Sequence, residues 1–293
     1  MFAVLLATLS SVSYGASDFS GAMASKRTDS AIVTVVAQFV SLIALVGVLL
    51  VVPPDEWIVR DLAWGAAGGV CVAVALVCFY RALAIGPMST AAATTALVGA
   101  LVPLVAGLAF GERPSVLTLV GIGVSIPAGA LVSAGGAGNR ASLRLTPRER
   151  WVAREFGALT TRLSFVAGVG FGLFFVLLSR ASDEAGLSPL LGARAASIGV
   201  LVLVLTAGGG WSRPHRSSIG YIAVAGVLDC AANATYLAAL DRGQLTWVAA
   251  IASLYPATTV ALAGIVLRER LTRVQIGGLV LAGVALALVA IGR

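Results

Sequence analysis

Four ionisable side chains fall inside stretches of the sequence that are otherwise apolar. Two are acids, Asp229 and Asp18, and two are bases, Arg194 and Arg81. A charge at the centre of a lipid bilayer costs at least roughly 2.5–3.5 kcal/mol, so charged residues in such stretches mark ion or substrate pathways by default. The chemistry open to these groups is reversible protonation of a carboxylate and the binding of a charged small molecule.

Other polar residues accompany both acids at helical spacing. Asp229, Asn233 and Tyr236 lie at positions i, i+4 and i+7, and Tyr14 precedes Asp18 by four residues. Polar stripes of this kind cannot face lipid, so each must face a cavity or another helix. One interpretation is a water-accessible central cavity lined by both stripes, in which the carboxylates accept protons or a cationic substrate.

The same residues allow a structural interpretation. Arg194 or Arg81 could neutralise the two acids and lock neighbouring helices together. Three roles are open to Arg194: the counter-charge of an acid, a binding group for an anionic substrate, or a side chain that snorkels toward the nearer membrane face.

Pro103 and Pro256 fall in the middle of two apolar stretches. Each removes a backbone hydrogen bond and is expected to kink its helix, which a helix that lines a cavity tolerates. The carbonyl groups freed in this way could bind a substrate, or the kink could serve packing alone. Tyr255, beside Pro256, could stack on a substrate.

The composition indicates that lipid is the solvent for most of the chain. Of its 293 residues, 59% are hydrophobic and only 11% are charged, whereas a soluble domain carries about a quarter charged residues. The mean hydropathy is +0.99. These values argue against a soluble enzyme, and three cysteines are too few for a secreted disulfide scaffold. The net charge of +7 is spread between apolar stretches rather than gathered in one domain, which argues against a nucleic-acid partner.

A helix needs about 20 mainly apolar residues to cross a bilayer. The sequence predicts ten such helices, near 2–22, 31–51, 62–83, 88–109, 115–134, 161–180, 189–207, 218–240, 246–267 and 273–291. The first is expected to remain as a span, because it lacks the positive start of a cleaved signal. One connection is long and rich in arginine, and its second half is expected to form a short amphipathic helix on anionic headgroups.

The two halves of the sequence repeat each other. A shift of 157 residues places Glu112 and Arg113 on Glu269 and Arg270, and several glycines also coincide. Each half then holds five spans, and an odd number gives the halves opposite orientations, with a binding site expected near the midplane. The predicted fold class is all-α integral membrane, with ten transmembrane helices as two inverted five-helix repeats. The first repeat covers 1–137, a basic linker covers 138–160, and the second repeat covers 161–293.

The charges at the ends of the spans add two expectations. The Glu-Arg pairs recur at equivalent span ends and are expected to cap or clamp the turns there. Most of the basic residues fall in connections that share one face with the long linker. Because Lys and Arg accumulate on the cytoplasmic side, both termini are predicted to lie outside, opposite the linker.

The repeated turns carry a resemblance to a known family. Gly111-Glu112-Arg113 ends the fourth predicted span and Arg268-Glu269-Arg270 ends the ninth, and each is followed by a glycine-containing span. Together with Ser17-Asp18-Phe19 and Ser253-Leu254-Tyr255-Pro256, this layout resembles EamA-type members of the drug/metabolite transporter superfamily. The resemblance covers nearly the whole chain apart from the linker. It implies a ten-helix secondary carrier that exports or imports small metabolites, and it does not imply a particular substrate.

The leading hypothesis is a gradient-coupled exporter of small organic metabolites in the inner (plasma) membrane, with Asp229 as the residue that gains and loses a proton in each cycle. Its expected partners are a small-molecule substrate, the lipid bilayer and protons, and its expected state is a monomer or weak dimer. We expect no cofactor or metal, because the chain has one histidine, and no use of ATP, because it has no Walker-type loop.

Two other classes remain open. A flippase for a lipid carrier would favour a groove lined by arginine rather than by acids. An integral-membrane enzyme would need a Ser/His/Asp or Cys/His set, which the sequence does not offer.

Overall fold

The computed structural model describes residues 2–85, 88–134, 147–208, 210–267 and 272–292, and these residues form helices and short connections. The α-helices are α1 (Phe2–Ser25), α2 (Ser30–Val51), α3 (Val59–Ile85), α4 (Met88–Ala109), α5 (Val116–Ala134), α6 (Pro147–Leu178), α7 (Pro189–Gly208), α8 (Ile219–Leu240), α9 (Leu245–Ala252), α10 (Tyr255–Val266) and α11 (Arg273–Gly292). Two short 3₁₀ helices, Asp183–Ala185 and Arg216–Ser218, lie in the connections.

Eight helical segments within these residues are long and apolar enough to cross a membrane, and two further apolar segments, Thr94–Ala109 and Val116–Val132, are shorter. Large apolar side chains lie on the outside of the bundle; Leu50 is 81% exposed and Ile43 is 70% exposed. Such a surface is unfavourable in water and favourable in lipid. The chain is therefore a multi-pass membrane protein, while the count of ten spans remains a prediction.

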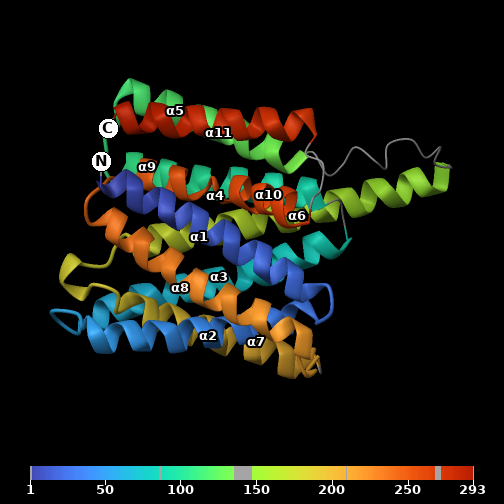
Figure 1. The fold of residues 1–293 in the computed structure, drawn as a ribbon, viewed down its shortest axis with the longest axis horizontal. Coiled ribbons are helices and arrows are strands. Elements are labelled where there is room, and N and C mark those ends of the chain that lie inside the picture. Colours follow the sequence, from blue (N-terminus) through green and yellow to red (C-terminus); the bar gives the residue numbers. More distant parts are fainter. Residues whose placement is uncertain (1, 86–87, 135–146, 209, 268–271, 293) are drawn as a thin grey trace.

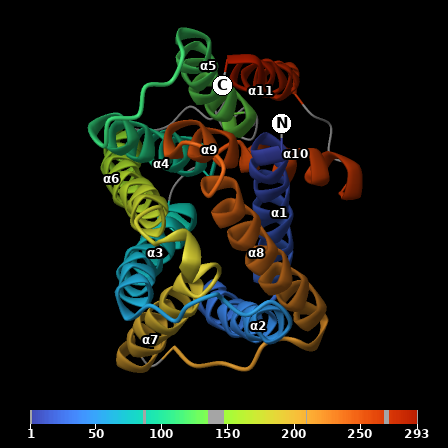
Figure 2. The same cartoon turned by 90° about the vertical axis from the view of Figure 1, so that its left-hand side faces the viewer.

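The helices form a bundle with two opposite walls. Seen from the end that carries both termini, α3 and α6 form one wall and α1 and α8 form the other (Figure 2). Helices α2 and α7 close the bundle on one side, and α4 closes it on the other with α9 and α10. Helices α5 and α11 pack side by side at the outer edge (Figure 1).

The predicted ninth span is two helices rather than one. Helix α9 ends at Ala252 and α10 begins at Tyr255, with Ser253 and Leu254 between them. Pro256 lies in the first turn of α10, where the missing N–H of proline has no intrahelical partner to lose. The expectation that Pro256 kinks a continuous helix is therefore wrong, whereas Pro103 does lie inside the continuous helix α4.

The linker also differs from its prediction. Its second half is helical, but it continues directly into the following span as one helix, α6, that starts at Pro147. The start of α6 extends beyond the bundle at the end opposite the termini (Figure 1). A separate amphipathic helix on the membrane surface is therefore not what the structure shows.

Glu112 caps a helix from the other half of the sequence. Its carboxylate oxygens accept hydrogen bonds from the backbone N–H groups of Leu245 at 2.7 Å and Thr246 at 2.9 Å, the first two residues of α9. A carboxylate at this place satisfies free N–H groups and opposes the positive end of the helix dipole. The N-cap residue Gln244 makes no side-chain cap of its own.

The turn after α4 positions the carboxylate of Glu112 at the start of α9. Gly111 has a φ of +91°, and the N–H groups of Gly111 and Glu112 bond back to the carbonyls of Leu108 and Gly107. This is the glycine-dependent arrangement that ends many helices. The capping role expected for Glu112 is thus present, but it joins the two halves rather than closing its own turn, and Arg113 is exposed. Glu269 and Arg270 lie outside the described residues.

We predict that Glu112→Ala lowers the stability of the protein. Loss of a helix cap costs about 1 kcal/mol, so the melting temperature in detergent should fall by a few degrees. Glu184→Ala, at an exposed position in the 3₁₀ helix Asp183–Ala185, is the matched control and should leave the melting temperature unchanged. An equal effect of the two changes would contradict the cap.

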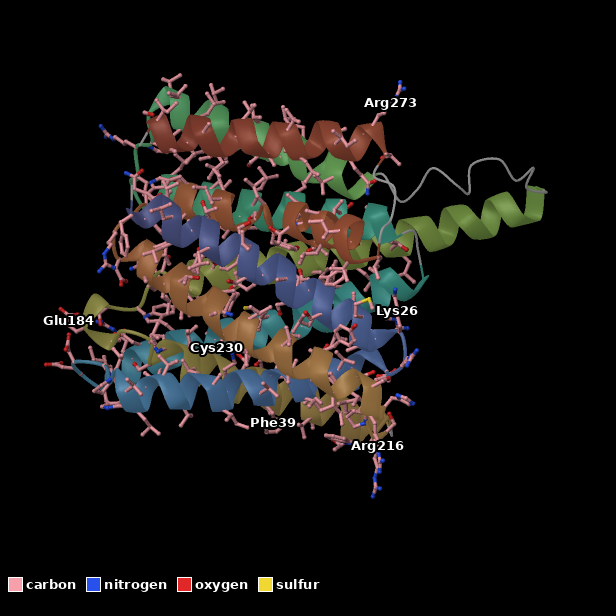
Figure 3. All side chains as sticks on the ribbon, in the orientation of Figure 1. Lys26, Phe39, Glu184, Arg216, Cys230 and Arg273 are labelled. Carbon is pink, nitrogen blue, oxygen red and sulfur yellow. The ribbon has the colours of Figure 1, made fainter. Side chains whose placement is uncertain are left out.

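We also predict that Arg216 and Glu184 lie on opposite sides of the membrane, because they lie at opposite ends of the bundle (Figure 3). In a background with Cys71, Cys78 and Cys230 replaced, a membrane-impermeant thiol reagent should label Glu184→Cys from outside the cell and Arg216→Cys only after the membrane is opened. Labelling of both from the same side would contradict the arrangement.

Candidate functional site

One cavity of about 120 Å³ lies inside the bundle, with residues from both halves of the sequence around it. Its lining residues are Tyr14, Asp18, Gln38, Val72, Leu76, Phe79, Thr95, Ala96, Gly99, Phe171, Phe174, Phe175, Arg194, Asp229, Asn233, Ser253 and Tyr255. Cys230, the neighbour of Asp229, lies about midway along the bundle (Figure 3). The cavity therefore lies near the middle of the bundle rather than at one of its ends.

The structure brings six of the predicted site residues together in this cavity: Tyr14, Asp18, Arg194, Asp229, Asn233 and Tyr255. It separates the other two from it. The ring of Tyr236 is fully buried and lies 4.4 Å from the ring of Phe175, and Pro256 is buried in the first turn of α10. The helix that carries Tyr236 presents that residue to the neighbouring helices, so Tyr236 supports the cavity wall instead of lining the cavity.

Arg194 and Asp229 form an ion pair, with Nη2 of Arg194 2.5 Å from Oδ2 of Asp229. The guanidinium is almost fully buried, at 4% exposure, while the side chain of Asp229 retains 25%. Nη1 of Arg194 donates a hydrogen bond to Oε1 of Gln38 at 2.5 Å. Of the three roles open to Arg194, this geometry is that of a counter-charge.

Hydrogen bonds complete the surroundings of Asp229. Ser41 donates from its hydroxyl to Oδ2 at 2.9 Å, and Asn233 donates from Nδ2 to Oδ1 at 3.2 Å. The hydroxyl of Tyr14 in turn donates to Oδ1 of Asn233 at 2.8 Å. One polar network therefore joins α1, α2, α7 and α8.

Asp18 stands apart from this network. Its side chain is exposed at the cavity. Among the residues that the structure describes, no hydrogen bond or ion pair to its carboxylate is found. Of the two acids that line the cavity, Asp18 is therefore the one that no described side chain neutralises.

Aromatic rings form much of the remaining wall. Phe79 and Phe171 pack edge to face with centroids 6.1 Å apart, and Phe174 and Phe175 lie 5.6 Å apart. Tyr14 packs edge to face on Phe175 at 6.1 Å. With Tyr255, six aromatic side chains line the cavity.

Tyr255 is placed by a close contact between α1 and α10. A side chain at Gly15 would overlap the backbone carbonyl of Tyr255 and the side chain of Thr258. The hydroxyl of Thr259 donates to the carbonyl oxygen of Gly15 at 3.0 Å. Only glycine permits this approach, and it brings the break between α9 and α10 up to the cavity.

Sequence reasoning missed several members of the site. Gln38 and Ser41 follow Thr34 at i+4 and i+7 in an apolar helix, so the stripe argument used for the eighth span could have found them. The phenylalanines gave no signal, because a lipid-facing phenylalanine looks the same in sequence. Arg81 is exposed and is not among the lining residues. In the described part of the chain, no cluster of three His, Cys, Asp or Glu side chains could hold a metal.

We predict that the Arg194–Asp229 pair is structurally coupled. Removing one partner of a buried pair costs roughly 3–5 kcal/mol, because the other charge is left uncompensated. Asp229→Asn and Arg194→Gln should each give little folded protein in the membrane, and the double variant should recover it. Fluorescence-detected size-exclusion chromatography measures the folded yield, and additive losses in the double variant would refute the coupling.

Comparisons with known proteins identify a family and a shared fold. The sequence matches the EamA-like transporter family over residues 1–134 and 159–291. Among curated proteins, no sequence matches this one. A solved structure, described only as the crystal structure of a protein, is similar with a TM-score of 0.78 over 99% of this chain and 96% of its own, at 14% identity, which shows a shared fold. Since the family match covers both halves, the chain belongs to the EamA-like transporter family.

Proposed function

We propose that this protein is a secondary active transporter that exports small organic metabolites across the plasma membrane. Its two inverted five-helix repeats, 1–137 and 161–293, would alternate in opening a central site to the two sides. The observation that carries the proposal is the mid-bundle cavity, because its polar and aromatic lining comes from both halves.

The packing of the helices supports two repeats related by a two-fold axis. If α6 is the counterpart of α1, and α8 that of α3, then the α1–α8 wall and the α6–α3 wall are equivalent. The contacts of α2 with α8 and of α7 with α3 then form a second equivalent pair. Helices α5 and α11, which are counterparts, pack on each other.

Glycines at repeat-equivalent positions support the same axis. A side chain at Gly121 would overlap Val289, and a side chain at Gly278 would overlap Val132. Under the shift of 157 residues, Gly121 corresponds to Gly278 and Val132 to Val289. The two contacts are therefore one contact made twice, with the halves exchanged.

The ends of the bundle differ in how tightly they pack. All eight residues of α9, toward the termini, are buried, whereas in α10 Pro256 alone is buried. Asp18, which reaches the cavity, lies two turns before the Lys26 end of its helix. Lys26, Arg216 and Arg273 lie at that same end (Figure 3). We take this end as the cytoplasmic one, so the cavity would receive its substrate from the cytoplasm, as export requires.

Coupling to protons requires an acid whose charge can change during the cycle. Asp229 was the expected residue, but its ion pair with Arg194 supports the structural alternative for it. Asp18 has no such partner among the described residues. We therefore assign the proton-binding role to Asp18.

The other function classes fit this cavity less well. A flippase would need room for a lipid and a free arginine for its phosphate, but the cavity holds about 120 Å³ and Arg194 is already paired. An enzyme of the Ser/His/Asp or Cys/His type would need a histidine or a cysteine at the site, and the described lining contains neither.

The transport function is tested in two steps. A comparison of metabolites released by overexpressing and deletion strains names a substrate, and purified protein in liposomes then moves it. In the fraction of Arg194→Ala that folds, the rate per folded protein should fall at least about tenfold, because Asp229 has lost its counter-charge in the cavity. Arg113→Ala, an exposed arginine, should retain the rate. Equal rates at matched protein amounts would remove Arg194 from the translocation path.

We predict that a pH gradient drives the wild-type protein and no longer acts on Asp18→Asn, since asparagine cannot titrate. The measurement compares substrate flux in proteoliposomes with and without an imposed gradient, with Asp55→Asn, an exposed loop acid, as the control. A full response of Asp18→Asn to the gradient would move the coupling site elsewhere.

A further inference from the structure

The charges of the cavity indicate what kind of substrate it binds, on the basis of the transporter function proposed above. Arg194 and Asp229 neutralise each other at 2.5 Å, and Gln38 takes the second nitrogen of the guanidinium. Asp18 is left as the one charged lining residue without a protein partner in the described part of the chain. With both acids ionised, the described lining of the cavity therefore carries one net negative charge.

A negative charge in this place attracts a cation strongly. Coulombic attraction grows as water is excluded and the local dielectric falls. Near mid-membrane, an uncompensated carboxylate is unfavourable, so a bound cation or a proton would relieve it. An anion would be repelled by Asp18, and the described lining offers no unpaired positive group to bind it.

The aromatic wall favours the same ligand. The faces of aromatic rings are electron-rich, and proteins bind quaternary ammonium groups in aromatic cages. Six aromatic side chains surround this cavity, and Phe79, Phe171 and Tyr14 come from three different helices. These rings can hold the apolar body of a ligand as well as its charged head.

A zwitterion fits less well than a cation. Its carboxylate would need a positive group, and the guanidinium of Arg194 is 4% exposed and engaged by two partners. The volume of about 120 Å³ limits the ligand to a small molecule. We propose that the substrates are small lipophilic monocations, protonated amines or quaternary ammonium compounds, with their charge at Asp18 and their apolar part among the phenylalanines.

Binding to the purified full-length protein in detergent tests this inference directly. The probes are benzyltrimethylammonium, phenylalanine and 3-phenylpropionate, which share one phenyl ring and differ in charge, and calorimetry gives their dissociation constants. The cation should bind at least about tenfold more tightly than the other two. Tighter binding of the zwitterion or the anion than of the cation would overturn the inference, and so would the lack of saturable binding of the cation.

Variants locate the binding site. Asp18→Asn should lower the affinity for the cation at least about tenfold, whereas Asp18→Glu should keep most of it. The loop variant Asp55→Asn should bind the cation as tightly as the wild type does. Phe79→Leu keeps an apolar wall but removes an aromatic ring, so it should lower the affinity for the cation roughly threefold. If Asp18→Asn proves unstable, the affinities of Asp18→Glu and Phe79→Leu still test whether the cation binds in this cavity. Unchanged cation affinity in Phe79→Leu and in a folded Asp18→Asn would overturn the assignment.

The same probes separate this inference from the transporter proposal. Proteoliposomes that accumulate phenylalanine in preference to the cation would retain the transport function and refute the substrate class. Tight binding of benzyltrimethylammonium that depends on Asp18, without any flux of it across the membrane, would support the cation site and refute the transport function.

Discussion

The ion pair of Arg194 and Asp229 is the interaction on which the centre of this protein depends. Two opposite charges persist away from water only while each compensates the other. Gln38, Ser41, Asn233 and Tyr14 complete the network and tie four helices to it. Because the hydrophobic effect does not drive helices together in lipid, such polar contacts and the close packing at small residues must hold the helices of the bundle together. The pair also sets the charge of the cavity, since it leaves Asp18 as the lining acid without a partner among the described residues.

The sequence predicted the elements well because a membrane span has a simple physical requirement. Each long apolar stretch had to be a helix, and helix α8 begins and ends within one residue of its predicted limits. Asp229, Asn233, Tyr14 and Asp18, which the stripe argument selected, line one cavity in the structure. The break between α9 and α10 was harder to predict from the sequence, because a proline is compatible with a kink or with the first turn of a new helix. The contact of α10 with Gly15 also joins residues that are far apart in the sequence.

The partners within the site could not be predicted, since they depend on how helices face one another. Periodicity shows that Tyr236 shares a helix face with Asn233, yet a face spans a wide arc, and Tyr236 lies against Phe175. From the sequence, Arg194 could have formed an ion pair with either acid, and only the structure shows that its partner is Asp229. The phenylalanines became site residues only when the fold separated those that face the cavity from those that face lipid.

The cap that Glu112 places on α9 links the halves at the tightly packed end of the bundle. If the halves move apart there, as the proposed cycle requires, the backbone N–H groups of the buried residues Leu245 and Thr246 lose their acceptor. That loss is an energy barrier whatever the substrate, so it would set how long the protein rests in the state described here. Stability and turnover would then oppose each other at a single carboxylate, and a faster carrier could evolve by giving up part of its own rigidity.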